Sequence, residues 1–462
     1  MSNSFSRRSF LQAAGGAGAF GLAGCAGFPA ITSSRSPNGK LRHLCIGCGS
    51  QGRSNIAKLA THKRIEMAAF CDVDMLMLDK LRAKFPKARF YQNWREMLDK
   101  EDADSVMVAT PDHSHCEIMS EVMRRGLNLY AEKPLCRSFA ECRQLESLAQ
   151  SSGVVTQLGM QIAAWECDRH TAELLRTGAI GKVKKVWLFS NSGYYAKLLE
   201  RKWPVEACAV PDTLDWDGWL ASAPKRAYSH KRYHSFVWRA WRDFGSGWLG
   251  DMGSHLFSPV WMGMGLDCTV PLSAKASVYD CGWSEEMKRQ FLPLYSHVTW
   301  KFPGVKATGM QPFEVEWCDG PSGGQVPKEF LPQGKTEEIA GNKAVSAGLS
   351  DEFLPPKRFQ EMAAKTPLGK LPVQGRVIEG SDGWMISTHF NMPPVLLTKD
   401  GQPRPLALPF ISPVPNHYHE YVDCCLDGGK TTTEFRWTTR LTDWLLLGRK
   451  AIDNPGVEVR IA

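Results

Sequence analysis

The sequence predicts an α/β protein with two domains, the first built on a doubly wound parallel sheet and the second an α+β domain with a mostly antiparallel sheet. Apolar runs alternate with helix-like segments over residues 41–158, which is typical of parallel β-α-β units. After about residue 159 the candidate strands alternate in polarity and are joined by turns, which favours antiparallel pairing. A glycine-rich turn follows the first apolar run, as in doubly wound proteins that bind a ligand there.

Length and composition support this division. A chain of 462 residues is too long for one ordinary core, and 43% hydrophobic with 23% charged residues is typical of a globular protein. We expect a leader over residues 1–30, a linker over 31–40, a first domain over 41–158 and a second over 159–462. The formal charge of +8 is scattered without a basic run, which argues against a nucleic-acid partner.

The leader has the features of an export signal. Ser6–Leu11 contains a twin-arginine pair, and the apolar segment 11–23 is shorter than the roughly 20 residues that span a membrane. Leu22-Ala23-Gly24-Cys25 resembles a bacterial lipobox, which predicts lipidation of Cys25; the alternative is ordinary cleavage near Ala30. The protein is therefore expected to be exported by the twin-arginine route, as a periplasmic protein or as a lipoprotein attached to the membrane only through Cys25.

The glycine-rich turn has the pattern of a dinucleotide site. The run Gly47-Cys48-Gly49-Ser50-Gln51-Gly52 lies between an apolar strand and a helix-like segment. Gly47 allows the tight turn, Gly49 lets a pyrophosphate approach the backbone, and Gly52 lets the helix pack on the strand. Ser50 and Gln51 begin the helix, whose free N–H groups attract phosphate. The spacing predicts a Rossmann domain that binds a dinucleotide.

Asp72 ends the second apolar run, about 20 residues after the glycines, where a carboxylate holds the adenosine ribose. It would accept hydrogen bonds from a free 2′-hydroxyl and repel a 2′-phosphate, which favours NAD over NADP; Arg53 could soften this preference. Because an exported enzyme has no soluble nicotinamide pool, we expect the cofactor to be tightly bound and regenerated on the enzyme.

The remaining elements are expected in order along the chain. In the first domain they are a helix at 75–85, a strand at 89–91, a helical turn at 94–98, strands at 105–109, 127–131 and 154–158, and helices at 116–125 and 138–151. In the second they are strands at 183–190, 273–279, 295–302, 376–379 and 384–387, an insertion or long loops over Gln311–Pro372, and a helix at 441–451 near the first domain.

Several motifs resemble the glucose-fructose oxidoreductase, inositol dehydrogenase and rhizopine-catabolism (Gfo/Idh/MocA) superfamily, in particular an exported bacterial branch. They are the glycine fingerprint, Thr110–His115, Glu132-Lys133-Pro134, Gly178–Val183, Leu214–Leu220, Trp238-Arg239 and Gly250–His255. The resemblance implies an open-faced second sheet, a homo-oligomer and a nicotinamide cofactor. With the strand ends it assigns the cofactor to the fingerprint, Asp72, Thr110, Pro111, His115, Glu132, Lys133 and Gln161.

Three side chains are candidates for catalysis. Asp251 and His255 are four residues apart on a predicted helix and so share one face. His255 can take the proton of an alcohol, and Asp251 can orient it, stabilise its charged form or bind a neighbouring hydroxyl. Lys133 can hold the substrate oxygen and stabilise alkoxide charge. The resemblance assigns Lys133, Asp251 and His255 the same positions; without it, a structural helix pair would be the simpler interpretation.

Other candidates keep two interpretations each. His115 and Asp112 either adjoin the nicotinamide or cap a helix. Trp238 and Arg239 either bind a sugar or pack the domain joint. Gln161 faces cofactor or substrate, and His417 with His419 are expected to serve packing or the surface. No set of cysteines and histidines has zinc-site spacing, so we expect no metal.

These features support three functions. The first is an NAD(P)-dependent oxidoreductase that transfers a hydride between a tightly bound cofactor and a hydroxyl of a sugar or glycoside. The second is a redox-neutral NAD-dependent glycosidase that works by oxidation, elimination, hydration and reduction. The third is a non-catalytic lipoprotein that retains the cofactor and binds a sugar.

Overall fold

The computed structural model describes residues 39–191, 203–234, 236–280, 283–320, 336–339, 342–345, 351–390, 392–412 and 416–461. The predicted leader, with Cys25, and nearly all of the linker lie outside these residues. The residues from Ser34 onward form one compact unit. Within the described residues, every helix is too short or too polar to cross a lipid bilayer.

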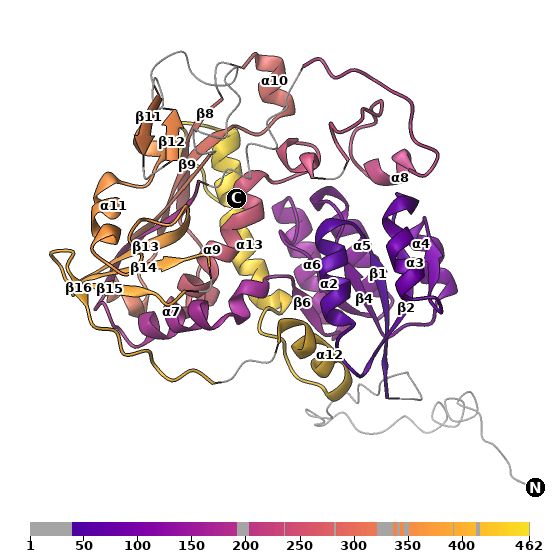
Figure 1. Cartoon of the computed structure of the whole chain (residues 1–462), viewed down its shortest axis with the longest axis horizontal. Helices are drawn as coiled ribbons and strands as arrows, with labels where there is room; N and C mark the ends of the chain where they lie inside the picture. The colour runs from indigo at the N-terminus through magenta and orange to yellow at the C-terminus, as the bar shows by residue number, and fades with distance from the viewer. Residues whose placement is uncertain are drawn as a thin grey trace, which may run out of the picture. The chain divides into compact units, whose positions relative to one another are not determined.

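The first domain is built on a six-stranded parallel sheet in the order β3-β2-β1-β4-β5-β6 (Figure 1), which confirms the predicted doubly wound sheet. Its central strands are buried on both faces because their residues are almost all apolar. The strands are β1 (Leu41–Ile46), β2 (Ile65–Cys71), β3 (Arg89–Tyr91), β4 (Ser105–Val108), β5 (Asn128–Ala131) and β6 (Thr156–Leu158), and the helices are α2 (Ser50–Leu59), α3 (Asp79–Lys84), α4 (Trp94–Lys100), α5 (Asp112–Arg124) and α6 (Phe139–Ser152).

Two helix starts show how local chemistry sets the boundaries. Ser138 and Glu141 form a reciprocal capping box at the start of α6. Helix α5 instead begins at Asp112, earlier than the predicted Cys116. Pro111 is extended just before it, and the hydroxyl of Ser114 donates to the carbonyl oxygen of Pro111 at 3.0 Å. The Asp112–His115 stretch is therefore the first turn of the helix.

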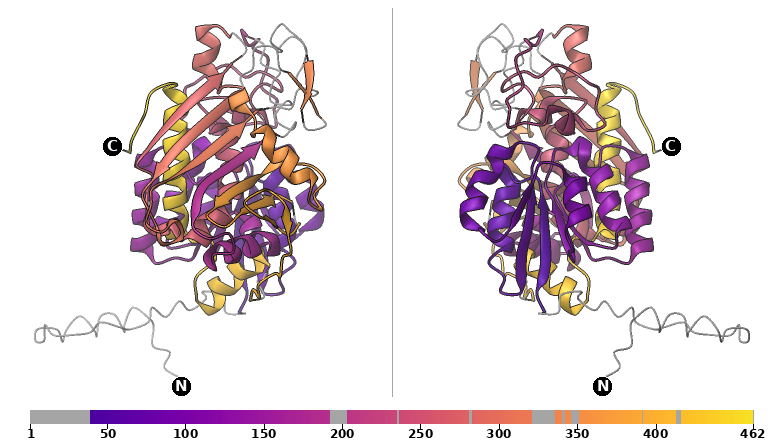
Figure 2. Two further views of the ribbon diagram at one scale, coloured as in Figure 1. Left: turned by 90° about the vertical axis from the view of Figure 1, so that its left-hand side faces the viewer. Right: turned by 90° about the vertical axis from the view of Figure 1, so that its right-hand side faces the viewer.

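The second domain contains an eight-stranded sheet in the order β16-β15-β14-β13-β7-β10-β9-β8 (Figure 2). Its pairs are antiparallel except β7 with β10, which confirms a mostly antiparallel sheet. The strands are β7 (Val183–Ser190), β8 (Ser273–Tyr279), β9 (Tyr295–Phe302), β10 (Phe313–Asp319), β13 (Gln374–Gly380), β14 (Trp384–Thr388), β15 (Val395–Leu397) and β16 (Pro403–Arg404), beside a separate hairpin of β11 (Thr336–Ile339) and β12 (Asn342–Val345).

The prediction that Gln311–Pro372 is an insertion or long loops was wrong in part. Strand β10 lies inside the main sheet between β7 and β9, and α11 (Lys357–Ala364) packs on Trp187 through Phe359. The pattern that identifies β10 is the alternation of buried Phe313, Val315 and Trp317 with more exposed glutamates. Residues 321–335, 340–341 and 346–350 of this stretch lie outside the described residues.

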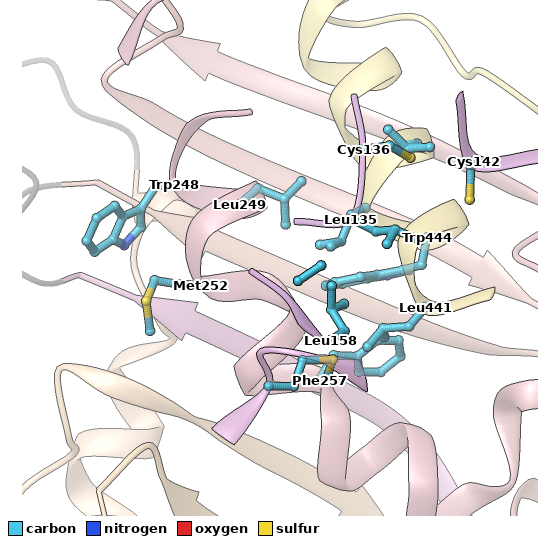
Figure 3. Packing of buried hydrophobic residues seen from close by; sticks show 14 of the residues in the cluster. Leu135, Cys136, Cys142, Leu158, Trp248, Leu249, Met252, Phe257, Leu441 and Trp444 are labelled. Carbon is cyan, nitrogen blue, oxygen red and sulfur yellow. The ribbon is translucent and has the colours of Figure 1, made fainter. Parts of the chain in front are cut away.

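Helix α13 (Phe435–Asp453) contacts α6 and β6 of the first domain as well as β8 and β9 of the second sheet, and α7 (Glu166–Arg176) and α9 (Gly247–Met264) pack on each other and on the second sheet. Figure 3 shows Leu135 and Leu158 of the first domain beside Phe257 of α9 and Trp444 of α13. The rings of Phe257 and Trp444 are 4.4 Å apart between centroids. This continuous core confirms that the C-terminal helix packs near the first domain, and it fixes α9 opposite the carboxyl ends of the parallel strands.

Candidate active site

A cavity of about 810 Å³ lies between the carboxyl ends of the parallel strands and residues of the second domain. This volume is in the range of ligand pockets in enzymes. One part of its wall is the glycine turn with Asp72, and another part is Lys133, Asp251 and His255. The cavity therefore joins the predicted cofactor residues to the predicted catalytic ones.

The glycine turn is too compact for side chains at two of its positions. Gly47 has a φ of +84°, and a Cβ there would lie 2.5 Å from the carbonyl oxygen of Ala109. A Cβ on Gly52 would lie 2.1 Å from the carbonyl oxygen of Gly47, whereas one on Gly49 would meet only the flexible side chain of Met77, at 3.4 Å. Helix α2 starts directly after Gly49 without a side-chain cap. The turn thus offers free N–H groups on an open side, which fits a pyrophosphate.

Asp72 closes this turn and faces the cavity. Its Oδ2 accepts the backbone N–H of Cys48 at 2.7 Å, and its Oδ1 accepts that of Asp74 at 3.0 Å. Burial raises the pKa of Asp72 to about 6, against the effect of these N–H groups. Hydroxyl donors of a ribose would stabilise the carboxylate further, so the residues present fit a dinucleotide.

A buried polar network holds the middle of the cavity wall. Glu132 Oε1 accepts the side-chain N–H groups of Asn55 at 2.6 Å and of Gln161 at 2.9 Å. Asn55 Oδ1 in turn accepts Gln51 Nε2 at 2.9 Å and the hydroxyl of Tyr418 at 3.0 Å. Burial raises the pKa of Glu132. This network fixes Gln51, Glu132 and Gln161 relative to one another and orients the backbone that carries Lys133.

Lys133 reaches across the cavity to the second domain. Its ammonium Nζ lies 2.7 Å from Asp251 Oδ1 and 2.6 Å from the carbonyl oxygen of Asp251. Arg239 also donates to Asp251 Oδ1, at 3.3 Å, and its guanidinium lies over the rings of Trp238 and Phe236. Burial alone would raise the pKa of Asp251, but the two cations outweigh it and hold that pKa well below its ordinary value.

His255 lines the same cavity, one helical turn after Asp251 on α9. Burial is the main cause that lowers its pKa well below the ordinary value, and the positive charge of Lys133 adds to it. The imidazole is therefore neutral at physiological pH and able to accept a proton. Among the described residues the ionic partners of Asp251 are Lys133 and Arg239, so its carboxylate organises the cations of the site more directly than it orients His255.

Most predicted cofactor residues line the cavity: Gly47, Gly49, Ser50, Gln51, Asp72, Thr110, Pro111, Glu132, Lys133 and Gln161. Gly52 lies behind the turn in its predicted packing role. His115 is placed differently from the prediction. It is 1% exposed, and its ring nitrogens lie 2.9 Å from the carbonyl oxygen of Pro134 and 2.8 Å from that of Thr110. Its ring lies between the loops that carry Thr110 and Pro134, and it is not among the residues that line the cavity.

Trp238 and Arg239 both line the cavity, so the interpretation that they face a ligand fits the structure better than packing of the joint alone. Sequence reasoning missed Asn55, Trp219 and His389. Asn55 is fully buried next to Ile56 in α2, but nothing in the local pattern separates it from a surface asparagine. Trp219 belongs to the motif Leu214–Leu220, and His389 follows the strand predicted at 384–387. In neither case does the neighbouring sequence indicate that the side chain lies near the active site. Within the described residues, no group of three or more His, Cys, Asp or Glu side chains could hold a metal ion.

Comparison with known proteins agrees with the fold and with the predicted family. Residues 41–160 match the oxidoreductase family with an NAD-binding Rossmann fold, GFO_IDH_MocA, and residues 168–282 match its C-terminal alpha/beta domain. The WlbA dehydrogenase from Bordetella pertussis, solved with NADH and UDP-GlcNAcA, has a similar fold, with a TM-score of 0.59 and 14% identity over 92% of this chain and 99% of that one. The aldose-aldose oxidoreductase from Caulobacter crescentus gives a TM-score of 0.56 and 15% identity over 91% and 100%.

Several of the sequence relatives carry glycosidase names. A glycosyl hydrolase family 109 protein of Shewanella baltica is 27% identical over an alignment of 201 residues that covers 38% of this chain and 44% of that protein. An alpha-N-acetylgalactosaminidase of Shewanella oneidensis is 28% identical over 114 residues, 23% of this chain and 25% of that one. The matched region thus spans less than half of these relatives. The matches to both domains, with the fold and the fingerprint, show that the chain belongs to the Gfo/Idh/MocA family of oxidoreductases.

Proposed function

We propose that the chain is an NAD-dependent enzyme that oxidises a hydroxyl of a sugar or glycoside while its cofactor stays bound. The observation that carries this proposal is the Lys133–Asp251 pair, 2.7 Å long, in one cavity with His255 and the glycine turn. An ammonium and a neutral imidazole beside a dinucleotide site are the groups that alcohol oxidation requires.

Each residue of the site has a separate role in the proposed oxidation. A nicotinamide held at this wall supplies the hydride acceptor. Lys133 donates a hydrogen bond to the reacting oxygen and stabilises negative charge on it, in a position that Asp251 fixes. His255 lines the same cavity with a neutral imidazole, so it can accept the hydroxyl proton. Arg239 keeps Asp251 ionised and presents a cation to neighbouring substrate oxygens.

Asp72 supports NAD as the cofactor. Its carboxylate lies on the cavity wall at the end of β2, where the adenosine ribose of a dinucleotide is bound in this fold. Arg53, which could favour a 2′-phosphate, lies against Met77, with Nη2 4.0 Å from the sulfur atom. A carboxylate at this position favours the free 2′-hydroxyl of NAD.

Tight retention of the cofactor is supported by a segment that we call the strap, residues 203–234 and 236–244. It returns from the second domain to the edge of the parallel sheet, where α8 (Trp216–Leu220) lies beside the first domain (Figure 1). Asp74 and Leu214 form an antiparallel bridge, in which Met75 N–H donates to Thr213 at 2.9 Å and Asp215 N–H donates to Val73 at 2.9 Å. Strap residues also line the cavity, so release of a dinucleotide requires the strap to move.

A disulfide across this bridge should slow cofactor exchange. The flanking hydrogen bonds make Asp74 and Leu214 a non-hydrogen-bonded pair, whose Cα atoms are about 4.5 Å apart, within disulfide range. In the double variant Asp74→Cys/Leu214→Cys we expect exchange of bound NAD for added NADH to be about tenfold or more slower when oxidised than when reduced. Fluorescence of bound NADH measures the rate. Wild type with and without reductant controls for the native cysteines, and equal rates in the two redox states would contradict the role of the strap.

A redox-neutral glycosidase is the second candidate, because several of the sequence relatives carry the names of glycosidases. In such an enzyme the hydroxyl is oxidised transiently, the glycosidic bond breaks by elimination, water adds and the hydride returns. The same Lys133 and His255 serve both reactions. A retained cofactor also suits an exported protein, which we propose on the basis of the leader.

One experiment separates these functions. The protein is purified natively, its bound nucleotide is identified by mass spectrometry, and absorbance at 340 nm is followed with a panel of free sugars and chromogenic glycosides. We expect bound NAD and either net NADH formation, for the oxidoreductase, or release of the chromophore without net NADH, for the glycosidase. Sugar binding without either signal would instead leave a non-catalytic binding protein.

A further inference from the structure

A second histidine adjoins His255 in the second domain. His389 follows directly after β14, and its ring centroid is 5.9 Å from that of His255, at 43° between planes. Its backbone N–H donates to the carbonyl oxygen of Gln374 at 3.1 Å. His255 is 6% exposed, whereas His389 is half-buried. The pair thus connects the interior of the site with a position closer to solvent.

The surroundings of His389 are fixed by a buried ion pair. Arg376 Nη1 lies 2.8 Å from Asp168 Oδ1, and both side chains are fully buried. Arg376 Nη2 also donates to the carbonyl oxygen of Thr388, the residue before His389, at 3.3 Å. The ion pair therefore holds the end of β14 in place behind the two imidazoles.

Burial, helped by nearby cations, keeps His389 neutral. Burial lowers its pKa to about 4; Arg376 on β13 and Lys133 after β5 add to this effect, and Asp251 on α9 opposes it. Nδ1 of His389 and Nδ1 of His255 are both buried and have no hydrogen-bond partner among the described residues. Buried polar atoms of this kind are normally satisfied by water or ligand. In each ring, Nδ1 is therefore able to donate or accept a proton.

We propose that His389 relays the proton that His255 takes from the substrate. This inference rests on the proposed function. The hydroxyl proton moves to His255, then through one bridging water or hydroxyl to His389, and from there to bulk water. Both imidazoles end neutral, and no electrons move in these steps. The ring centroids are 5.9 Å apart and the Nδ1 atoms of both rings have no hydrogen-bond partner among the described residues, so the two imidazoles are close enough for one small group to carry a proton between them.

The positive charge near His255 explains why a proton relay is needed. A protonated His255 would be buried beside Lys133, where a second positive charge is strongly disfavoured, so the proton must leave His255 as the hydroxyl is oxidised. His417 also lies within electrostatic reach of His255, but it is 4% exposed and both of its ring nitrogens are buried. His389 is the more exposed of the two, which makes it the better exit.

The test compares His389→Ala with wild type in single turnovers of the holoenzyme, followed at 340 nm on a sugar or glycoside that the panel identifies. We expect the rate to fall about tenfold or more, with KM changed by less than about threefold, and added imidazole to restore it in a saturable manner. The lost rate should recover as pH rises, because hydroxide then takes over the proton. His297→Ala, on β9 beside Glu316, is the matched control and should behave as wild type.

The possible results separate a failure of the proposed function from a failure of the relay alone. If wild type itself does not turn over any sugar or glycoside, the proposed function fails and the relay fails with it. If wild type turns over and His389→Ala is equally fast, or is slow without rescue by imidazole, the relay alone is wrong. A rise in KM with an unchanged rate would also overturn it, since that result assigns His389 to substrate binding. Melting temperature and bound nucleotide are measured on each variant, and His389→Gln replaces the alanine variant if that protein does not fold.

Discussion

Replacing Lys133 with methionine should lower kcat by about a thousandfold or more, which corresponds to about 4 kcal/mol of transition-state stabilisation. Methionine keeps much of the length and apolar stem of lysine but removes the ammonium that donates to Asp251 at 2.7 Å and that would donate to the reacting oxygen. Asp251 keeps Arg239 as a partner at 3.3 Å, so we expect the fold and the bound nucleotide to remain. The measurement is the rate of cofactor reduction at saturating substrate, together with the nucleotide content of the purified protein.

Lys185→Met is the matched control for this prediction. Lys185 is also a partly buried lysine with carboxylate partners, since its Nζ lies 3.0 Å from Glu314 Oε2 and also pairs with Glu316, but it belongs to the second sheet away from the cavity. We expect its loss to leave kcat within about twofold of wild type, because partly exposed ion pairs contribute little. A Lys133→Met protein that is folded, loaded with nucleotide and still active within about tenfold would exclude Lys133 as the group that stabilises the reacting oxygen.

The parts that could be predicted from the sequence depend on local physics. The glycine turn, the position of Asp72 and the parallel sheet follow from spacing, from backbone freedom and from apolar runs that need burial on both faces. The shared helix face of Asp251 and His255 follows from the helical repeat. Lys133 was placed at a strand end, where ligands bind in such sheets. Each of these features is encoded within about thirty neighbouring residues.

The parts that could not be predicted depend on residues far apart in the chain. Arg239 and Lys133 both bind Asp251, and no local pattern indicates that one carboxylate serves two cations from separate segments. His115 was predicted to bind cofactor because it ends a strand-end motif, but its ring lies between two backbone carbonyls that only the folded loops bring together. His389 meets His255 because β13 positions the end of β14, which the sequence of either segment alone does not reveal.

A substitution in the glycine turn is expected to have the second large effect. The three glycines of this turn differ in whether they tolerate a side chain. Replacing Gly52 with alanine should lower the free energy of unfolding by about 3 kcal/mol and remove nucleotide from the purified protein. The new Cβ would lie 2.1 Å from the carbonyl oxygen of Gly47, and neither backbone can move without displacing β1 or α2. The urea midpoint, the melting temperature and the bound nucleotide measure both consequences.

Gly49→Ala is the control that separates packing from cofactor binding. Its Cβ would meet only the sulfur of Met77 at 3.4 Å, and Gly49 has backbone angles that alanine adopts freely (φ −79°, ψ 171°), so the urea midpoint without nucleotide should be unchanged or slightly higher. NAD affinity should nevertheless fall about tenfold or more, which is about 1.4 kcal/mol, because the methyl group occupies the side from which a pyrophosphate approaches the N–H groups of α2. If Gly49→Ala bound NAD as tightly as wild type, the dinucleotide would have to lie elsewhere in the cavity, because a pyrophosphate on this turn contacts the backbone where that methyl group stands.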